Sequence, residues 1–96
     1  MEDVNRMLNS VGKKIFVDHY YEFKDLNISK DLLAKKLLEE NPNSKKLSGQ
    51  LIRISFARKI FANNLQKEAL EIILNSNRLD EKTIKKAEEI IEREFN

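Results

Sequence analysis

Histidine and paired carboxylates are the side chains in this sequence that could exchange protons or hold a metal ion. His19 is the only histidine, and the chain has no cysteine. A histidine that acts as a base needs a nucleophile or an orienting carboxylate, and a zinc site needs three or four ligands. The nearby Asp18 and Glu22 are expected on the polar side of their helix. We therefore interpret His19 as a packed residue with local hydrogen bonds.

Adjacent carboxylates occur at Glu39-Glu40 and at Glu88-Glu89. An acid–base pair of the glycosidase kind needs one carboxyl group whose pKa is raised by burial, and neither pair lies in an apolar setting. We expect these carboxylates to be solvated. The sequence thus predicts no catalytic residue, no metal site, no cofactor and no small-molecule substrate, and we expect no enzyme.

Basic residues are concentrated in the central third of the chain. The net charge is only +2, yet residues 41–67 contain no acidic residue. A block of one sign can focus a potential on one surface. We expect this block to contact nucleic-acid phosphate through Lys45, Lys46, Arg53, Lys59 and Lys67. The alternative is that these cations pair with the acidic flanking segments inside the fold.

The segment 28–62 can be interpreted as two helices joined by a turn. DNA-reading pairs of this kind place side chains on the second helix, here Gln50, Arg53, Arg58 and Lys59. The connection from Asn41 to Leu47 is longer than the turn of about 3–4 residues that such pairs favour. No aromatic residue alternates with the basic ones, so stacking on a single strand is not indicated.

A surface for a protein partner or a second copy of the chain is the rival hypothesis. Val17 and Tyr21 lie one turn apart, away from the main apolar stripe of their helix, and Tyr20 lies beside them. Exposed apolar patches on small proteins usually mark contacts. Val17, Tyr20 and Tyr21 are therefore the candidate interface, unless this helix is simply wedged between two neighbours.

The segments 57–64 and 67–71 resemble tetratricopeptide units in the spacing of small residues and of an Ala-Leu pair. This resemblance covers about a third of the chain. It implies a helical hairpin that binds a peptide, which agrees with the rival hypothesis. No family is identified over the full length.

Length and composition limit the chain to one small domain over residues 1–96. Hydrophobic residues make up 41% and charged residues 35%, which is too apolar for a disordered chain and too charged for a membrane protein. The longest apolar run has three residues, and the acidic start has no apolar segment behind it. We expect no membrane span, no secretory signal and a cytoplasmic location.

Apolar residues recur every three or four positions almost throughout, which predicts an all-helical chain. We expect a compact bundle of four to five short helices near residues 3–24, 30–40, 47–62, 65–75 and 80–95. The helix near 47–62 is expected to be central, because it is apolar on two sides. Ser44 or Ser48 is its expected N-cap, and Asp80 is the expected N-cap of the last helix. Leu26 and Leu32 are expected to face inward. Gly12 leaves open whether 3–24 forms one helix or two, and the alternation over 52–56 leaves a strand open there.

Overall fold

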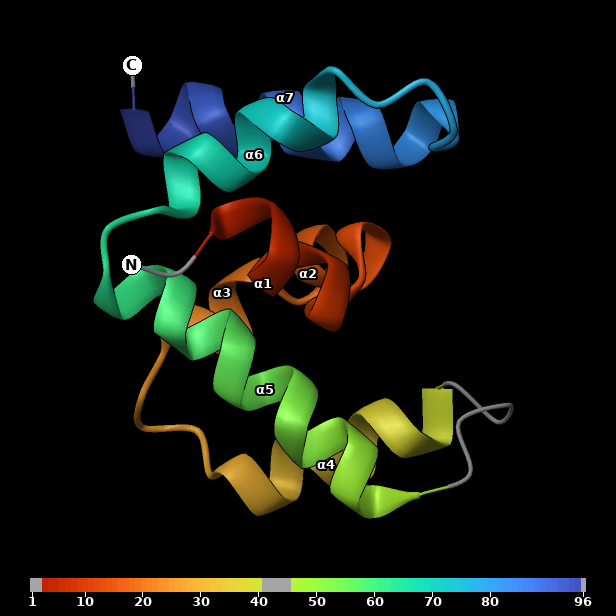
Figure 1. Ribbon diagram of the computed structural model, residues 1–96, viewed down its shortest axis with the longest axis vertical. Helices are drawn as coiled ribbons and strands as arrows, with labels where there is room; N and C mark the ends of the chain where they lie inside the picture. The colour runs from red at the N-terminus through yellow and green to blue at the C-terminus, as the bar shows by residue number, and fades with distance from the viewer. Residues whose placement is uncertain (1–2, 41–45, 96) are drawn as a thin grey trace.

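The computed structural model describes residues 3–40 and 46–95, and these residues form seven α-helices and no strand. In chain order the helices are α1 (Val4–Val11), α2 (Lys13–Asp18), α3 (Tyr20–Lys24), α4 (Lys30–Glu40), α5 (Leu47–Ala62), α6 (Gln66–Leu74) and α7 (Glu81–Phe95). The all-α prediction is confirmed, and the residues for which a strand was left open are helical. Figure 1 shows α6 and α7 side by side at one end of the molecule and α4 at the other. None of these seven helices has the length and apolar character that a membrane crossing requires.

The expected number of four to five helices is wrong because the segment 3–24 contains two breaks. Gly12 has a φ of 94°, in the region that favours glycine, and its N–H donates to the Leu8 carbonyl oxygen. This residue separates α1 from α2. His19, with φ of −119° and ψ of 23°, separates α2 from α3. The segment therefore forms three short helices rather than one or two.

Helix α5 begins and ends where the sequence predicts, and it packs against α1, α3, α4 and α6. Its buried face carries Ile54, Ala57 and Ile60, each with no exposed surface. Ile52, on the opposite side, is 56% exposed. The expectation that this helix is buried on two sides is therefore wrong at Ile52, because none of the seven described helices covers that part of its surface.

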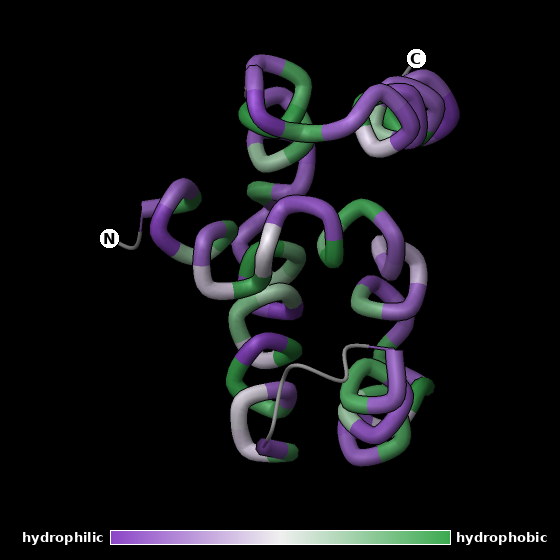
Figure 2. The backbone as a smooth tube through the Cα atoms, turned by 90° about the vertical axis from the view of Figure 1, so that its right-hand side faces the viewer, coloured by the Kyte–Doolittle hydropathy of each residue, from purple (hydrophilic) through white to green (hydrophobic). Residues whose placement is uncertain are grey.

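Aromatic rings from α2, α3 and α5 form the middle of the core. Phe16, Tyr20 and Phe23 are fully buried. The ring centroid of Phe61 on α5 lies 5.7 Å from that of Phe16 and 5.0 Å from that of Tyr20. Figure 2 shows how hydrophobic and hydrophilic residues alternate around the helices that surround this cluster.

The N-caps of α5 and α7 agree only in part with those expected from the sequence. Asp80 caps α7 as expected, since its Oδ1 accepts the N–H of Thr83 at 2.8 Å. Hydrogen bonding to Thr83 lowers the pKa of Asp80. Lys46 is the N-cap of α5 and makes no side-chain cap hydrogen bond, while the expected cap Ser48 lies inside the helix. The other candidate cap, Ser44, lies outside the described residues.

Two substitutions on α5 test this packing. We expect Ile54→Ala to lower the free energy of unfolding by about 2–5 kcal/mol, because it leaves a cavity in the core. Ile52→Ala, on the exposed side of the same helix, should change it by less than about 0.5 kcal/mol. Urea denaturation followed by circular dichroism measures both. Equal losses would contradict the assignment of a single buried face.

Candidate functional site

Four of the five cations predicted to bind phosphate lie in the described residues, and these four are spread over α5 and α6. Lys46 lies at the start of α5 and Lys59 in its last turn, and both are exposed. At about 1.5 Å per residue they are about 20 Å apart along the helix. Lys67 lies on α6, with its Nζ 5.9 Å from the ring centroid of Phe95. Lys45 lies outside the described residues.

Arg53, the remaining cation of that set, is held inside the fold. Its Nη1 donates to Oε1 of Gln50 at 2.9 Å, and Gln50 is only 1% exposed. Burial lowers the pKa of the Arg53 guanidinium. The proposed DNA-reading role of Gln50 is therefore wrong, because its side chain faces the interior, and Arg53 is half-buried beside it.

Arg58, another candidate of the helix-turn-helix interpretation, is held by backbone oxygens. Its Nη2 donates to the carbonyl oxygen of Ile28 at 2.7 Å and to that of Asp25 at 3.3 Å. These carbonyls lie in the loop between α3 and α4. Arg58 thus fastens this loop to α5, and a base contact by this side chain is not available without releasing it.

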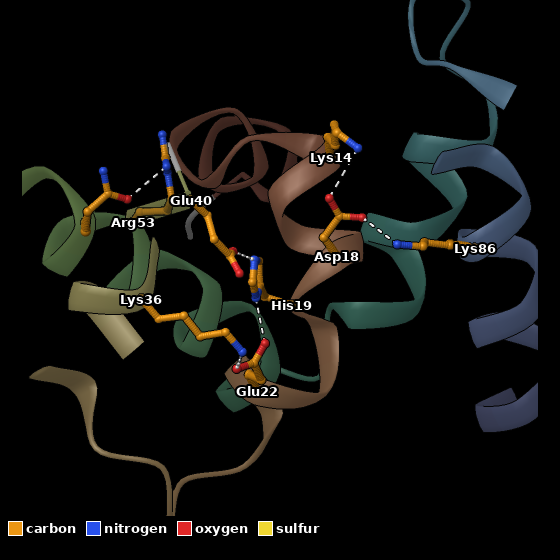
Figure 3. Close-up of polar contacts among 9 residues, drawn as sticks. Lys14, Asp18, His19, Glu22, Lys36, Glu40, Arg53 and Lys86 are labelled. Carbon is orange, nitrogen blue, oxygen red and sulfur yellow. Dashed lines mark hydrogen bonds and ion pairs between the residues drawn. The ribbon is translucent and has the colours of Figure 1, made fainter. Parts of the chain in front are cut away.

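Ion pairs join carboxylates to lysines outside the basic block. Asp18 pairs with Lys14 at 3.3 Å and with Lys86 at 3.1 Å, which links α2 to α7 (Figure 3). Lys24 pairs with Glu94 and ties α3 to α7 as well. These contacts connect α7 to the N-terminal half of the chain.

His19 lies between two carboxylates, as Figure 3 shows. Its Nδ1 is 2.6 Å from Oε1 of Glu22, and its Nε2 is 2.8 Å from Oε2 of Glu40. Lys36 on α4 binds the other oxygen of Glu22 at 2.7 Å. The expectation that Glu22 points away from His19 is wrong, because residues three apart lie on the same side of a helical turn. The network connects α3 with α4.

The pKa of Glu22 reflects its position in this network. Burial alone would raise the pKa, but hydrogen bonds from Lys36 and His19 outweigh burial and lower it. Within the described residues, no group of three or more His, Asp or Glu side chains is arranged to hold a metal ion. The ion pairs from Glu40 to His19 and from Lys36 to Glu22 join α4 to the α2–α3 segment.

A shallow groove of about 180 Å³ lies between α7 and the α2–α3 segment. We call it the α7 groove, and its lining residues are Val17, Asp18, Tyr21, Lys86, Glu89, Ile90 and Arg93. Val17 and Ile90 are buried and form an apolar floor, and Tyr21 is 41% exposed. Charged side chains of both signs surround this floor.

Tyr21 is the accessible aromatic ring of the α7 groove. The Tyr20 ring packs edge-on against it with centroids 5.1 Å apart, and the Arg93 guanidinium lies 6.0 Å from its ring centroid. Tyr20 is only 1% exposed and Val17 only 3%. The prediction that all three residues form an open surface is therefore wrong for Tyr20 and Val17, which are buried, and Val17 lies at the floor of the groove.

The sequence did not indicate the part of the groove that comes from α7. Glu89 was expected to be a solvated carboxylate, and Lys86, Ile90 and Arg93 were not singled out. Their common spacing along one side of the helix was the available signal. The position of α7 beside Tyr21 depends on packing between segments about 70 residues apart in the chain, and local sequence patterns do not predict such packing.

Comparison with known proteins adds no family to this description. The chain matches no family model, no curated protein and no solved structure. Its function must therefore be inferred from its own side chains.

The lowered pKa of Glu22 predicts how the fold responds to acid. Its contribution to stability is present above the pKa of an unfolded glutamate, about 4.3, and is lost as the pH falls through the lower folded value. Glu22→Gln removes this contribution, so we expect its stability to fall less between about pH 5 and pH 2 than that of the wild type. Urea denaturation at a series of pH values measures the difference. Glu71→Gln, at an exposed position on α6, is the matched control and should behave as the wild type does.

Proposed function

We propose that this protein is a small non-enzymatic binding module that docks a partner protein in the α7 groove. The observation that carries the proposal is Tyr21, an exposed aromatic ring held between Tyr20 and Arg93 over an apolar floor. Tyrosine and arginine are enriched among the residues that contribute most to binding at protein interfaces. A ring that is already fixed loses little conformational freedom when a partner binds.

The charges of the groove indicate what a partner segment should carry. Within residues 3–40 and 46–95, Arg93 has no carboxylate within ion-pair distance, whereas Lys86 is engaged by Asp18. A guanidinium binds a carboxylate through two parallel hydrogen bonds. We propose that the partner presents an apolar side chain to Val17 and Ile90 and a carboxylate to Arg93.

Binding of selected peptides tests this proposal. Random peptides enriched on the immobilised protein should lose affinity at least about tenfold with Tyr21→Ala, the loss expected for a binding hot spot. Leu26→Ala is the matched control, because Leu26 is 77% exposed and lies outside the groove. Fluorescence anisotropy measures the affinities, and circular dichroism checks that both variants fold. Peptides that bind Tyr21→Ala as well as the wild type would contradict the proposal.

Contact with nucleic-acid phosphate through Lys46, Lys59 and Lys67, together with Lys45, is the second candidate function. It is supported by the position of Lys46 at the start of α5, whose first turn has no acidic residue. Helix N-termini favour anions, because their amides and dipole are positive there. The dispersal of the cations and the burial of Arg53 make this candidate weaker than the first.

A salt titration separates the two functions. If Lys46 and its neighbours bind phosphate, affinity for random duplex DNA should fall steeply with salt, with a slope of about 0.9 per phosphate contacted. Lys46→Glu with Lys67→Glu should then abolish binding, while Lys35→Glu with Arg6→Glu, a control of equal charge change at exposed positions, should retain part of it. Absence of binding at about 50 mM salt would exclude this candidate.

A further inference from the structure

Both nitrogens of the His19 ring face a carboxylate oxygen. Nδ1 lies 2.6 Å from Oε1 of Glu22 on α3, and Nε2 lies 2.8 Å from Oε2 of Glu40 on α4. His19 is only 9% exposed, and its ring packs edge-on against Phe23, with centroids 6.2 Å apart. Figure 3 shows the ring between the two carboxylates. The ring thus takes its hydrogen-bond partners from two different helices.

This geometry matches only one charge state of the ring. A carboxylate can only accept hydrogen bonds, whereas a neutral imidazole has one N–H donor and one lone pair. In either neutral tautomer, Glu22 at 2.6 Å or Glu40 at 2.8 Å would face the lone pair, which repels it. An imidazolium donates to both. Because imidazole is a stronger base than a carboxylate, the second proton belongs on the ring.

The surrounding charges balance an imidazolium. Lys36 binds the other oxygen of Glu22 at 2.7 Å, so His19, Lys36, Glu22 and Glu40 together carry two positive and two negative charges. Within residues 3–40 and 46–95, no third carboxylate lies within 4.0 Å of a ring nitrogen. Loss of the second proton from His19 would leave this group with a net negative charge.

Charged residues on the other neighbouring elements are engaged elsewhere. Asp18, which precedes His19 in the chain, pairs with Lys86 on α7. Arg53 on α5 donates to Gln50 and forms no ion pair with the carboxylates beside the ring. The charge of His19 is therefore coupled mainly to Glu22 and Glu40.

We propose that His19 is a pH-dependent switch that holds the C-terminal end of α4 against the α2–α3 segment as an imidazolium and releases Glu40 when it becomes neutral. Glu40 is the last residue of α4. It is also the partner that is easier to release, because its side chain is 46% exposed and that of Glu22 only 27%. Glu22 is held by Lys36 as well, so the remaining N–H stays with Glu22 and Glu40 turns to water.

The direction of the pH dependence follows from proton linkage. A folded state that binds a proton more tightly than the unfolded chain is stabilised at low pH. This contribution is fully present below about pH 6.5, where an unfolded histidine is also protonated, and is lost as the pH rises and the ring becomes neutral. His19 is the only histidine and the chain has no cysteine, so ordinary side chains other than His19 keep their charge between about pH 5.5 and 8.5.

Glu40→Gln tests the switch. An amide can accept a hydrogen bond from an Nε2–H or donate one to a neutral Nε2, so this contact no longer requires the imidazolium. Between about pH 5.5 and 8.5 we expect the equilibrium constant for unfolding to rise at least about threefold more in the wild type than in this variant, as for a partly exposed ion pair. Urea denaturation followed by circular dichroism measures both proteins.

Glu39→Gln is the matched control. It makes the same change of charge at the adjacent exposed position of α4, and Glu39 does not contact the His19 ring. Its stability should depend on pH as that of the wild type does. The chain's amino group also titrates in this range, but it is common to all three proteins and cancels in the comparison.

Nuclear magnetic resonance gives a structural readout on the wild type. At about pH 5.5 both ring nitrogens of His19 should carry protons, and the carboxyl carbon of Glu40 should shift with the same midpoint as the ring when the pH is raised. The carboxyl carbon of Glu39 should not follow the ring. These shifts together with a pH dependence that Glu40→Gln reduces would support the switch. Equal pH dependence in the wild type and Glu40→Gln, or a Glu40 carboxyl that ignores the titration of the ring, would overturn it.

Discussion

The packing of aromatic rings between α3 and α5 is the interaction on which the candidate site depends. Tyr20 lies at the first position of α3, and its ring is fixed in the core against Phe16 and Phe61. Successive helical residues are rotated by about 100°, so Tyr21 points to a different side of α3 from Tyr20. Since α7 lies on that side, the Tyr21 ring lines the α7 groove. The break at His19 sets the rotation of α3 and therefore contributes to the same result.

Local patterns in the sequence were sufficient for the class of fold and for its longest helix. The three- and four-residue spacing of apolar residues predicts the bounds of α5, and Asp80 is recognisable as a cap because it precedes a periodic segment. The number of helices was not predictable in this way. Gly12 was noticed as a breaker, but the break at His19 has no glycine or proline to indicate it.

Which apolar positions become buried depends on neighbours that the sequence does not reveal. Leu26 and Leu32 were expected to face inward, yet they are 77% and 67% exposed. Gln50, a polar residue, is buried instead, because Arg53 satisfies its side-chain oxygen. A helical wheel gives the direction of a side chain relative to its own helix, and burial depends also on where the other helices lie. The same limitation concealed the contribution of α7 to the groove.

The distribution of charge along the sequence differs from the distribution of charge on the surface of the fold. The basic block between residues 41 and 67 is conspicuous in the sequence, but Arg58 is held by loop carbonyls and Arg53 by Gln50. Helix α7 shows the converse, since its charges nearly cancel in the sequence and are separated into two halves along its exposed side. One-sign blocks are therefore only the first place to look for an electrostatic partner.

The attachment of α7 to the rest of the molecule connects the fold to the proposed binding. This helix buries only Thr83, Ala87 and Ile90, of which the first two are small. The ion pairs that join it to α2 and α3 are partly exposed, and such pairs contribute at most about 1 kcal/mol each. The position of α7 therefore depends mainly on its packing against α2 and α6. A partner that covers the outer side of α7 and Tyr21 would contact both walls of the groove and hold them together. Binding there would stabilise the docked position of α7, since any molecule that binds only the folded state favours that state.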